Sequence, residues 1–369
     1  MRCCELKALI LAGGYATRLR PLSYALPKLL FQVCDRPILE HTIEHLSSFG
    51  IDEVILAVKY LADQLREYFG EEYHGVKIRY SLEPSPLGTG GPIALARQYY
   101  RSERILAMNG DILAEINLDA MRRLHESNNA LATIALHEVE DPTRFGAVEL
   151  DEHLRITKFV EKPKLADAPS KLVNAGIYLL EPGAIDLIPE GRRVIIEREV
   201  FPALASEGKL SGYVHSGTWF DIGNISDFRN ANFACLESMT RGKIIKAPDA
   251  SLSGSAKLTH PLLIGNHATV EDGVGLGPQT IIGHGVHIHR NASVVGTIVF
   301  DNVEIGSDSS IEGAVIGNSV RIGKGVMIQR GSVIAGHVNI RDNVHITRDV
   351  YVHPHREVAE DINSPGHVV

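Results

Sequence analysis

Two glycines followed closely by two arginines mark the first place where the chain could do chemistry. Gly13 and Gly14 come directly after the apolar residues 9–12, and Arg18 and Arg20 follow within the next six positions. An apolar run that ends at glycines is typical of an inner parallel strand, and glycine lets the backbone approach a bulky anion closely. The spacing fits neither the GxGxxG of dinucleotide folds nor the GxxxxGK[ST] of P-loops. We therefore interpret the segment as a third kind of phosphate-binding loop.

Two cations near this loop could offset the charge of a triphosphate. Arg18 lies four residues after Gly14, and Lys28 follows Pro27. Backbone N–H groups alone would leave most of a triphosphate's charge unpaired, whereas guanidinium and ammonium groups can neutralise it. Arg18 and Lys28 are therefore the predicted phosphate-binding cations.

Two aspartates could hold a divalent cation. Asp111 follows an expected strand at residues 105–108, and Asp221 lies in a second acidic turn at residues 219–223. Mg²⁺ keeps several waters and takes few protein ligands, so two carboxylates leave room for phosphate oxygens. Asp111 and Asp221 are the predicted metal pair. Either residue alone would more often be a helix cap or a turn former, so the prediction depends on their occurring together with the cations.

Two further segments suggest a sugar phosphate as substrate. Glu161 and Lys162 end an expected strand, and Asn174 stands two positions before Gly176. A carboxylate and an amide suit hydroxyl groups, and an ammonium group suits a phosphate. Taken singly, Lys162 would be a solvated strand end and Asn174 a turn residue.

Alternating strands and helices are expected to position these residues. The expected strands are residues 9–11, 54–58, 76–80, 105–108 and 132–136, and the expected helices are residues 38–49, 61–69, 92–100 and 118–127. This alternation predicts an α/β fold with a mostly parallel sheet and helices on both faces. Ligands bind beyond the carboxyl ends of such strands, where the turns at Gly13 and Asp111 would both lie.

A six-residue repeat dominates the last third of the chain. Its aliphatic positions are Ile264, Val270, Leu276, Ile282, Ile288, Val294, Val299, Ile305, Ile311, Ile316, Ile322, Ile328, Ile334, Ile340 and Ile346. Hexapeptide repeats build a parallel β-helix with one aliphatic ladder per face, so three repeats would make one coil, and about five coils are expected. Two steps of five residues would shorten a corner. The expected domains are residues 1–238, a linker at 239–260, and the β-helix with its tail at 261–369.

Composition limits the possible partners. The 369 residues carry a formal net charge of −8 and no dense Lys/Arg run, which disfavours nucleic acid. The four cysteines show no metal spacing and are expected to be reduced thiols, and no stretch reaches the length of a membrane span. We expect a cytoplasmic protein without a membrane partner.

Taken together, the motifs resemble those of the sugar-1-phosphate nucleotidylyltransferases. The resemblance is carried by residues 13–21, 27–28, 159–163, 174–178 and 219–223. Residues 83–92 and 196–202 are most similar to the guanylyltransferases that act on mannose 1-phosphate. The family implies a Rossmann-like nucleotidyltransferase domain followed by a left-handed parallel β-helix, and nucleotidyl transfer from GTP to mannose 1-phosphate with Mg²⁺.

The resemblance also implies roles for individual residues. Nucleotide-binding residues would be Leu11, Ala12, Gly13, Gly14, Arg18, Lys28, Glu83 and Gly88. Residues for the sugar phosphate would be Gly146, Glu161, Lys162, Asn174, Gly176 and Glu197, and the metal would lie at Asp111 and Asp221. Catalysis would depend on Arg18, Lys28, Asp111, Lys162 and Asp221. One departure is Ala16, where the family commonly has glycine, so a positive φ there would be strained.

Two other functions fit the same motifs. One is transfer from dTTP or UTP to glucose 1-phosphate, and the other is a regulatory subunit that senses nucleotide sugars without catalysis. The histidines of the repeat, His284, His287, His289, His337 and His345, could suggest acyl transfer, but we expect most of them to be exposed corner residues. The β-helix is expected to form a homo-oligomer.

Overall fold

The computed structural model describes residues 6–369, which form two compact units. One unit joins the chain up to Tyr15 with Ile38–Asp221, and the other joins Ala16–Pro37 with Ile222–Val369. The segment that carries Arg18 and Lys28, expected within the first domain, thus groups with the C-terminal part. Cys3 and Cys4 lie outside the described residues, and Cys34 and Cys235 form no disulfide. Among the described helices, none combines the length and the hydropathy that a membrane crossing requires.

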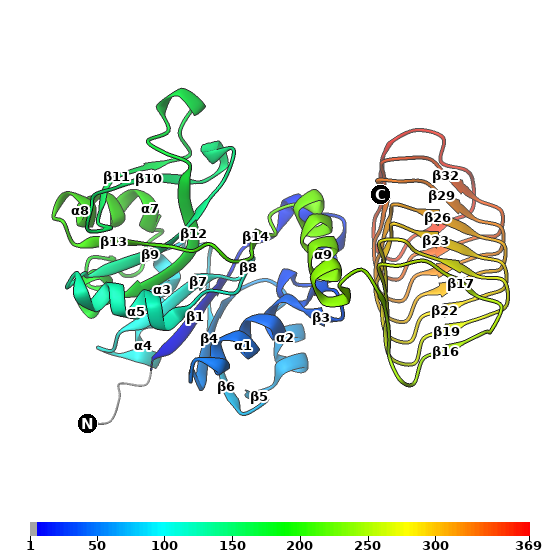
Figure 1. The fold of residues 1–369 in the computed structure, drawn as a ribbon, viewed down its shortest axis with the longest axis horizontal. Helices are drawn as coiled ribbons and strands as arrows, with labels where there is room; N and C mark the ends of the chain where they lie inside the picture. The colour runs from blue at the N-terminus through cyan, green and yellow to red at the C-terminus, as the bar shows by residue number, and fades with distance from the viewer. Residues whose placement is uncertain (1–5) are drawn as a thin grey trace. The chain divides into compact units, whose positions relative to one another are not determined.

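The first unit is built on a ten-stranded mixed sheet whose parallel part matches the expectation (Figure 1). Neighbouring parallel strands run in the order β6, β4, β1 and β7. Their bounds are Val76–Leu82, Glu53–Val58, Lys7–Ala12 and Ile105–Asn109. β1 is central, with parallel neighbours paired to both of its edges, and its middle residues Ala8, Leu9 and Ile10 are fully buried.

The rest of this sheet is largely antiparallel, which the alternation of elements did not predict. β12 pairs antiparallel with β7, β9 and β10, β11 pairs antiparallel with β10, and β13 runs parallel to β9. The bounds are β9 Ala132–Glu138, β10 Gly146–Leu150, β11 Ile156–Glu161, β12 Leu172–Leu180 and β13 Leu210–Val214. A short β5, Glu72–Tyr73, closes the other edge, and β8 (Ile112–Ala114) with β14 (Trp219–Asp221) forms a separate two-stranded sheet.

Helices of the first unit connect these strands. They are α1 Ile38–Ser48, α2 Ala62–Phe69, α3 Gly91–Leu95, α4 Arg97–Tyr100, α5 Leu118–Ser127, α6 Pro182–Ile185, α7 Ile196–Glu199 and α8 Phe201–Ser206, with short 3-10 turns η4 Pro142–Arg144 and η5 Leu165–Asp167. The single helix expected at residues 92–100 is interrupted at Ala96, whose ψ of 1° leaves the helical range. The other expected helices agree within about two residues, which is the usual uncertainty at helix ends.

The second unit contains three stacked parallel sheets, consistent with a left-handed parallel β-helix (Figure 1). The eight-stranded sheet consists of β15 Ile244–Lys246, β18 Leu262–Ile264, β21 Thr280–Ile282, β24 Ile298–Val299, β27 Val315–Ile316, β30 Val333–Ile334, β33 Val350–Val352 and β35 Gly366–Val368. The seven-stranded sheet consists of β16 Ser251–Leu252, β19 Thr269–Val270, β22 His287–Ile288, β25 Glu304–Ile305, β28 Arg321–Ile322, β31 Asn339–Ile340 and β34 Glu357–Val358. The six-stranded sheet consists of β17 Lys257–Leu258, β20 Gly275–Leu276, β23 Ser293–Val295, β26 Ser310–Glu312, β29 Met327–Ile328 and β32 His345–Ile346.

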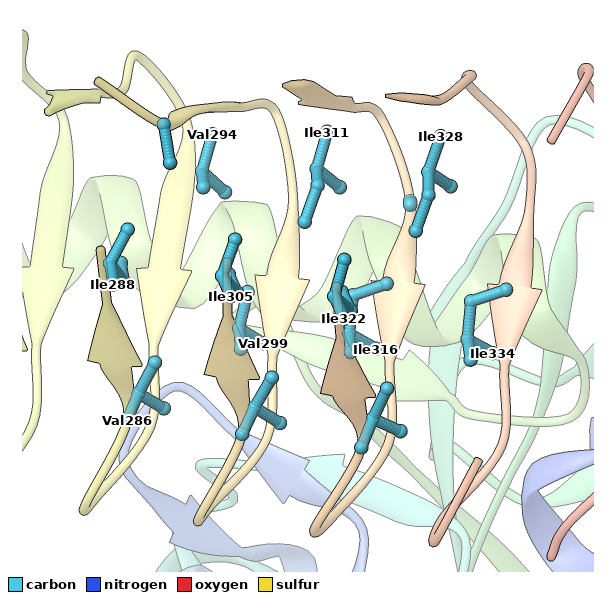
Figure 2. Close-up of a cluster of buried hydrophobic side chains, with 14 of the residues drawn as sticks. Val286, Ile288, Val294, Val299, Ile305, Ile311, Ile316, Ile322, Ile328 and Ile334 are labelled. Carbon is cyan, nitrogen blue, oxygen red and sulfur yellow. The ribbon is translucent and has the colours of Figure 1, made fainter. Parts of the chain in front are cut away.

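All fifteen predicted aliphatic positions lie in the interior of the β-helix. Figure 2 shows several of them stacked from coil to coil, including Ile288, Ile305 and Ile322. Val270 pairs with Ile288 eighteen residues later, whereas Ile282 pairs with Val299 seventeen residues later. The steps of five therefore shorten individual coils, as predicted.

The expected linker at residues 239–260 is wrong, because most of it is the first coil. Residues 244–246, 251–252 and 257–258 pair in parallel with the strands of the next coil. Its interior contacts come from the small or partly buried Ala250, Leu252 and Leu258. A terminal coil has a neighbour on one side only, so it needs less apolar surface and the repeat is weaker there.

One face of the β-helix is apolar outside as well as inside. The outward residues Leu263, Ile281, Ile298, Val315 and Val333 of the eight-stranded sheet are all nearly fully buried. The helix α9, Ile225–Thr240, contacts β18 on this sheet. The outward residues of the other two sheets are mostly polar and exposed, such as Glu304 and Arg321.

The segment Ala16–Pro37 packs against α9 and the β-helix. It consists of η1 Thr17–Leu19, η2 Leu22–Tyr24, η3 Lys28–Leu30, β2 Gln32–Val33 and β3 Arg36–Pro37. Phe31 is fully buried, with ring centroids 5.7 Å from Phe228 of α9 and 6.4 Å from Phe300 of the β-helix. The Cys34 N–H also donates to Asn232 Oδ1 at 2.9 Å. These contacts hold the segment that carries Arg18 and Lys28.

Replacing an inward residue of the β-helix should destabilise the protein, whereas replacing its outward neighbour should not. Ile328 is 1% exposed, and the adjacent Met327 is 48% exposed. We expect Ile328→Ala to lower the free energy of unfolding by about 2–5 kcal/mol through lost burial and a residual cavity. Met327→Ala is the control and should change it by less than about 0.5 kcal/mol. Equal effects in denaturant unfolding of the two variants would contradict the inward assignment of Ile328.

Candidate active site

The glycine loop begins where the central strand ends, and a buried carboxylate lies against it. A Cβ atom added to Gly13 would lie 1.9 Å from Glu83 Oε1, so no larger residue fits without displacing that carboxylate. Glu83 is 7% exposed, and its Oε2 accepts a hydrogen bond from the Leu87 N–H at 3.3 Å. Burial raises the pKa of Glu83 above its ordinary value, against the effects of that hydrogen bond and of Lys59. The glycine loop and Glu83, both predicted to bind the nucleotide, thus lie side by side in the first unit.

The loop expected to border the base is fixed by backbone contacts. Gly88 has a φ of 79°, and a Cβ there would lie 2.3 Å from the Val194 carbonyl oxygen. The Val194 N–H donates to the Leu87 oxygen at 2.9 Å, and the Gly90 N–H donates to the Val194 oxygen at 3.0 Å. Gly88 is therefore required by a close backbone approach as well as by its positive φ.

The two predicted metal ligands lie on paired segments. Asp111 follows β7 and precedes Ile112 of β8, and Ile112 is the antiparallel partner of Asp221 in β14. The Gly110 N–H donates to the Leu11 oxygen at 2.9 Å, which ties this turn to the strand that ends in the glycine loop. Two carboxylates one register position apart supply the oxygen ligands that Mg²⁺ prefers.

The part of β12 around Asn174 and Gly176, where the register with β9 shifts, lies against both of these segments. The Gly176 N–H donates to Asn174 Oδ1 at 2.8 Å, and a Cβ on Gly176 (φ 75°) would lie 2.7 Å from Asn109 Nδ2. Trp219 of β14 donates through Nε1 to the Ala175 oxygen at 3.0 Å. The part of β12 predicted to bind hydroxyl groups is therefore held between the end of β7 and the strand that carries Asp221.

Glu197 is held by two hydroxyl groups that sequence reasoning missed. Thr89 Oγ1 donates to Glu197 Oε2 at 2.5 Å, and the Tyr178 hydroxyl lies 3.4 Å from Glu197 Oε1. Asn174 Nδ2 donates to the same Tyr178 hydroxyl at 3.0 Å. Burial and the nearby Glu197 carboxylate raise the pKa of Tyr178 well above its ordinary value, so the hydroxyl stays protonated. Thr89 lies within residues 83–92 and Tyr178 within residues 174–178, two segments that carry the family resemblance. Neither side chain is charged, so nothing in the sequence singled them out.

Glu161 and Lys162 lie where β11 ends, opposite Gly146 of β10. Gly146 and Glu161 are register partners, and a Cβ on Gly146 would lie 2.6 Å from Phe159 Cζ. Lys162 has a φ of 49°, and its Nζ lies 3.8 Å from Glu161 Oε1. A lysine in this conformation is strained, and such strain is often found at functional sites. Burial, together with repulsion from Glu197, raises the pKa of Glu161.

Arg18 and Lys28 belong to the second unit with the β-helix. Arg18 lies in η1, which starts after Ala16, and Lys28 lies in η3. Arg18 and Arg20 line a cavity of about 700 Å³ whose other walls come from the start of α9 and from the last coils of the β-helix. The Arg20 guanidinium lies 4.7 Å from the ring centroid of Tyr24. Both arginines therefore face an open space with room for an anion.

The predicted site residues are thus divided between the two units. The first unit holds Leu11, Ala12, Gly13, Gly14, Glu83, Gly88, Asp111, Gly146, Glu161, Lys162, Asn174, Gly176, Glu197 and Asp221, and the second holds Arg18 and Lys28. Of the repeat histidines, His284 contacts the Asp35 oxygen through Nε2 at 3.1 Å, while His287 and His289 share a carboxylate partner, Glu271.

Family models match both parts of the chain. The nucleotidyl transferase model matches residues 7–238, and the GMPPB C-terminal domain model matches residues 258–368. This chain belongs to the nucleotidyl transferase family. The expected family and the expected β-helix are both confirmed.

Named relatives extend over the whole chain. Mannose-1-phosphate guanylyltransferase 1 of Arabidopsis thaliana is 34% identical over 366 residues, covering 98% of this chain and 99% of that protein. The mannose-1-phosphate guanylyltransferase of Mycobacterium tuberculosis is 36% identical over 304 residues, covering 81% of each. Among solved structures, HddC from Yersinia pseudotuberculosis superposes with a TM-score of 0.53 at 28% identity, covering 62% of this chain and 98% of that one. A UDP-glucose pyrophosphorylase from Acinetobacter baumannii, with a TM-score of 0.56 at 22% identity over 63% and 94%, shares the fold.

The strain expected at Ala16 is present, and it can be tested. Ala16 has φ 46° and ψ 43°, the left-handed conformation that favours glycine. We expect Ala16→Gly to change the free energy of unfolding by no more than about 1 kcal/mol and to keep full activity, because relief of strain offsets added chain entropy. Ala16→Val should lower both stability and activity, since β-branching is costly at positive φ.

A matched control for Ala16 is Ala25, whose φ of −111° and ψ of −20° suit any residue. Ala25→Gly should only destabilise, because there is no strain to relieve. If Ala16→Gly and Ala25→Gly destabilise equally in thermal unfolding, Ala16 is not strained.

The raised pKa of Glu161 predicts a pH-dependent gain on neutralising it. A carboxyl whose pKa is raised on folding costs nothing below the pKa of the unfolded chain, about 4.3, and destabilises progressively as the pH rises through the folded pKa. Glu161→Gln should therefore unfold at a higher temperature than the parent at neutral pH, and at nearly the same temperature near pH 4. The exposed Glu149 of the same hairpin provides a control, and Glu149→Gln should show no such difference.

Proposed function

We propose that this protein transfers the guanylyl group of GTP to mannose 1-phosphate, which forms GDP-mannose and releases pyrophosphate. The observation that carries the proposal is the similarity to the Arabidopsis thaliana guanylyltransferase, which covers 98% of this chain and 99% of that protein. A match of that extent includes the sheet, its polar turns and the β-helix. The cations and carboxylates that this reaction needs are all present in the chain.

The chain's own residues would act by positioning and by charge. An oxygen of the sugar phosphate attacks the α-phosphorus of GTP in line, and pyrophosphate leaves on the opposite side, so no protein nucleophile is required. Arg18 would bind the phosphates that leave, and Lys28 would extend toward the reacting phosphorus. Lys162 would hold the attacking phosphate. Cations placed before the reaction stabilise developing charge more effectively than water does.

The hexose would be recognised by a fixed carboxylate and an amide. Thr89 and Tyr178 orient Glu197, and Asn174 contacts the same tyrosine. These polar side chains are therefore arranged before substrate arrives. Glu161 would add a second carboxylate for sugar hydroxyl groups. The raised pKa of Glu161 and the fixed orientation of Glu197 are consistent with a site that is completed by a polar ligand.

Members of the nucleotidyl transferase family typically use a divalent metal, and Asp111 and Asp221 fit Mg²⁺. Both are half-buried carboxylates on paired segments, and hard oxygen ligands suit this ion. When bound, Mg²⁺ neutralises phosphate oxygens and orients them. Asp111 and Asp221 would fix its position relative to the glycine loop through the Gly110–Leu11 hydrogen bond. We also propose that copies of the chain associate through the β-helix.

Pyrophosphate release over a grid of substrates tests the proposed function. The full-length protein would be mixed with Mg²⁺, with GTP, dTTP, UTP or ATP, and with mannose 1-phosphate or glucose 1-phosphate. We expect the highest kcat/KM for GTP with mannose 1-phosphate. Release with only dTTP or UTP and glucose 1-phosphate would replace the proposed substrates, and no release with any pair would indicate a regulatory subunit.

Removing one metal-binding carboxylate should abolish turnover without unfolding the protein. We expect Asp111→Asn to lower kcat by at least about two orders of magnitude, because charge stabilisation by a metal site is worth several kcal/mol. Asp119→Asn in α5 changes an exposed carboxylate and should leave kcat unchanged. Near-normal turnover of a folded Asp111→Asn variant would exclude Asp111 from the metal site.

A further inference from the structure

Two histidines and a glutamate converge on the outer side of the β-helix. Ile288 points into the interior, as Figure 2 shows, so its neighbours His287 and His289 both lie on the outer side of the strand. Thr269–Val270 is the paired strand of the adjacent coil, and Glu271 follows it directly. The regular stacking of coils therefore brings residues 16 and 18 positions apart onto one spot.

The donor atoms of this cluster lie close together. Glu271 Oε1 is 2.9 Å from His287 Nε2 and 3.0 Å from His289 Nδ1, and the two imidazole rings are 4.1 Å apart. These three ligand atoms all lie within 4.8 Å of one another. The side chains are 42%, 27% and 30% exposed for His287, His289 and Glu271, so the cluster is accessible from solvent.

Outer contacts orient two of the three side chains. The second nitrogen of His289, Nε2, lies 3.2 Å from Glu304 Oε1 on the next coil. A carboxylate that binds one imidazole nitrogen fixes the proton there and leaves the other nitrogen free to coordinate, the usual arrangement around metal-bound histidine. The other oxygen of Glu271, Oε2, accepts the Arg290 N–H at 3.2 Å, so Oε1 remains turned toward the histidines.

We propose that Glu271, His287 and His289 bind a divalent transition-metal ion of the zinc type. Zinc takes imidazole nitrogen and carboxylate oxygen at about 2.0–2.2 Å, and a three-ligand site leaves one position for water or another ligand. Glu271 Oε1 lies about 3 Å from each nitrogen, and two ligand atoms of a tetrahedral zinc ion lie about 3.3 Å apart, so little movement is needed to place an ion among them. The nitrogen donors distinguish this site from the oxygen-only pair Asp111 and Asp221, which favours Mg²⁺. An ion here would join two consecutive coils of the β-helix.

Metal titration of the full-length protein tests this site. Co²⁺ would be added in the presence of excess Mg²⁺, which occupies oxygen-only sites, and visible absorption would report imidazole coordination. Zn²⁺ would then be added to displace Co²⁺, and calorimetry would give the stoichiometry. We expect one equivalent of Co²⁺ to bind with a tetrahedral spectrum, Zn²⁺ to displace it, and the unfolding temperature to rise when Zn²⁺ is bound.

Variants separate this site from adventitious histidine binding. Glu271→Gln and His289→Ala should each abolish the Co²⁺ spectrum, and Glu304→Gln should weaken binding by about 10–100-fold because it removes the orienting carboxylate. His337 and His355 stack with ring centroids 4.8 Å apart elsewhere on the same β-helix, and His337→Ala is the control that should leave binding unchanged. No saturable binding, or binding that persists in Glu271→Gln and His289→Ala or is lost in His337→Ala, would overturn the proposal.

Discussion

Contact among three phenylalanines is the constraint on which the second unit depends. Phe300 follows the inward Val299 and therefore faces outward, yet it is only 1% exposed because Phe31 and Phe228 cover it. Gln32 Nε2 adds a hydrogen bond to Asp301 Oδ2 at 2.5 Å. A segment close to the N-terminus is thereby fixed to a coil that lies about 270 residues later in the chain. Since this segment carries Arg18 and Lys28, the β-helix holds in place the two cations to which the proposed function assigns the phosphates.

In the first unit, the corresponding constraint is close packing around buried carboxylates. Gly13 leaves space for Glu83, and Thr89 and Tyr178 hold Glu197. A buried carboxylate destabilises the fold unless a hydrogen bond or a ligand offsets its loss of hydration. The raised pKa values of Glu83 and Glu161 indicate that this loss is only partly offset. In the proposed function, the same arrangement would place acceptors for sugar and base before substrate binds, so a cost in stability would be exchanged for order in the site.

Much of the fold could be predicted because its local patterns are regular. Each inward position of the β-helix has nearly the same surroundings, so one six-residue period identified every predicted ladder residue. The first coil was missed because Ala250 and Leu252 satisfy a weaker requirement at the end of the stack. The antiparallel partner of β7 was missed because pairing direction depends on distant segments and not on local hydropathy.

The site residues that the sequence proposes are those that charge or glycine marks, and their roles remain predictions. Gly13 and Asp111 follow the ends of β1 and β7, where ligands of such sheets bind, whereas Asn174 lies inside β12 at a shift of its register with β9. The strain at Ala16 followed from one missing glycine. Thr89 and Tyr178 carry no charge, and what links them to the proposed site is the contact of their hydroxyl groups with Glu197. That contact is visible in the structure and not in the sequence. The attachment of residues 16–37 to the β-helix was hidden for another reason, because Phe31 and Phe300 share no sequence pattern.

The most direct test of the account compares guanylyl transfer by two full-length variants that each lose a buried β-helix side chain. Phe300→Ala removes the contact with Phe31, and Ile311→Ala removes an inward residue of the interior ladder. At a temperature where both variants are folded, kcat/KM for GTP should fall by about tenfold or more in Phe300→Ala, because small displacements of positioning groups are costly, and should stay near the parent value in Ile311→Ala. Equal kcat/KM in the two variants would contradict the claim that the β-helix supports the phosphate-binding cations.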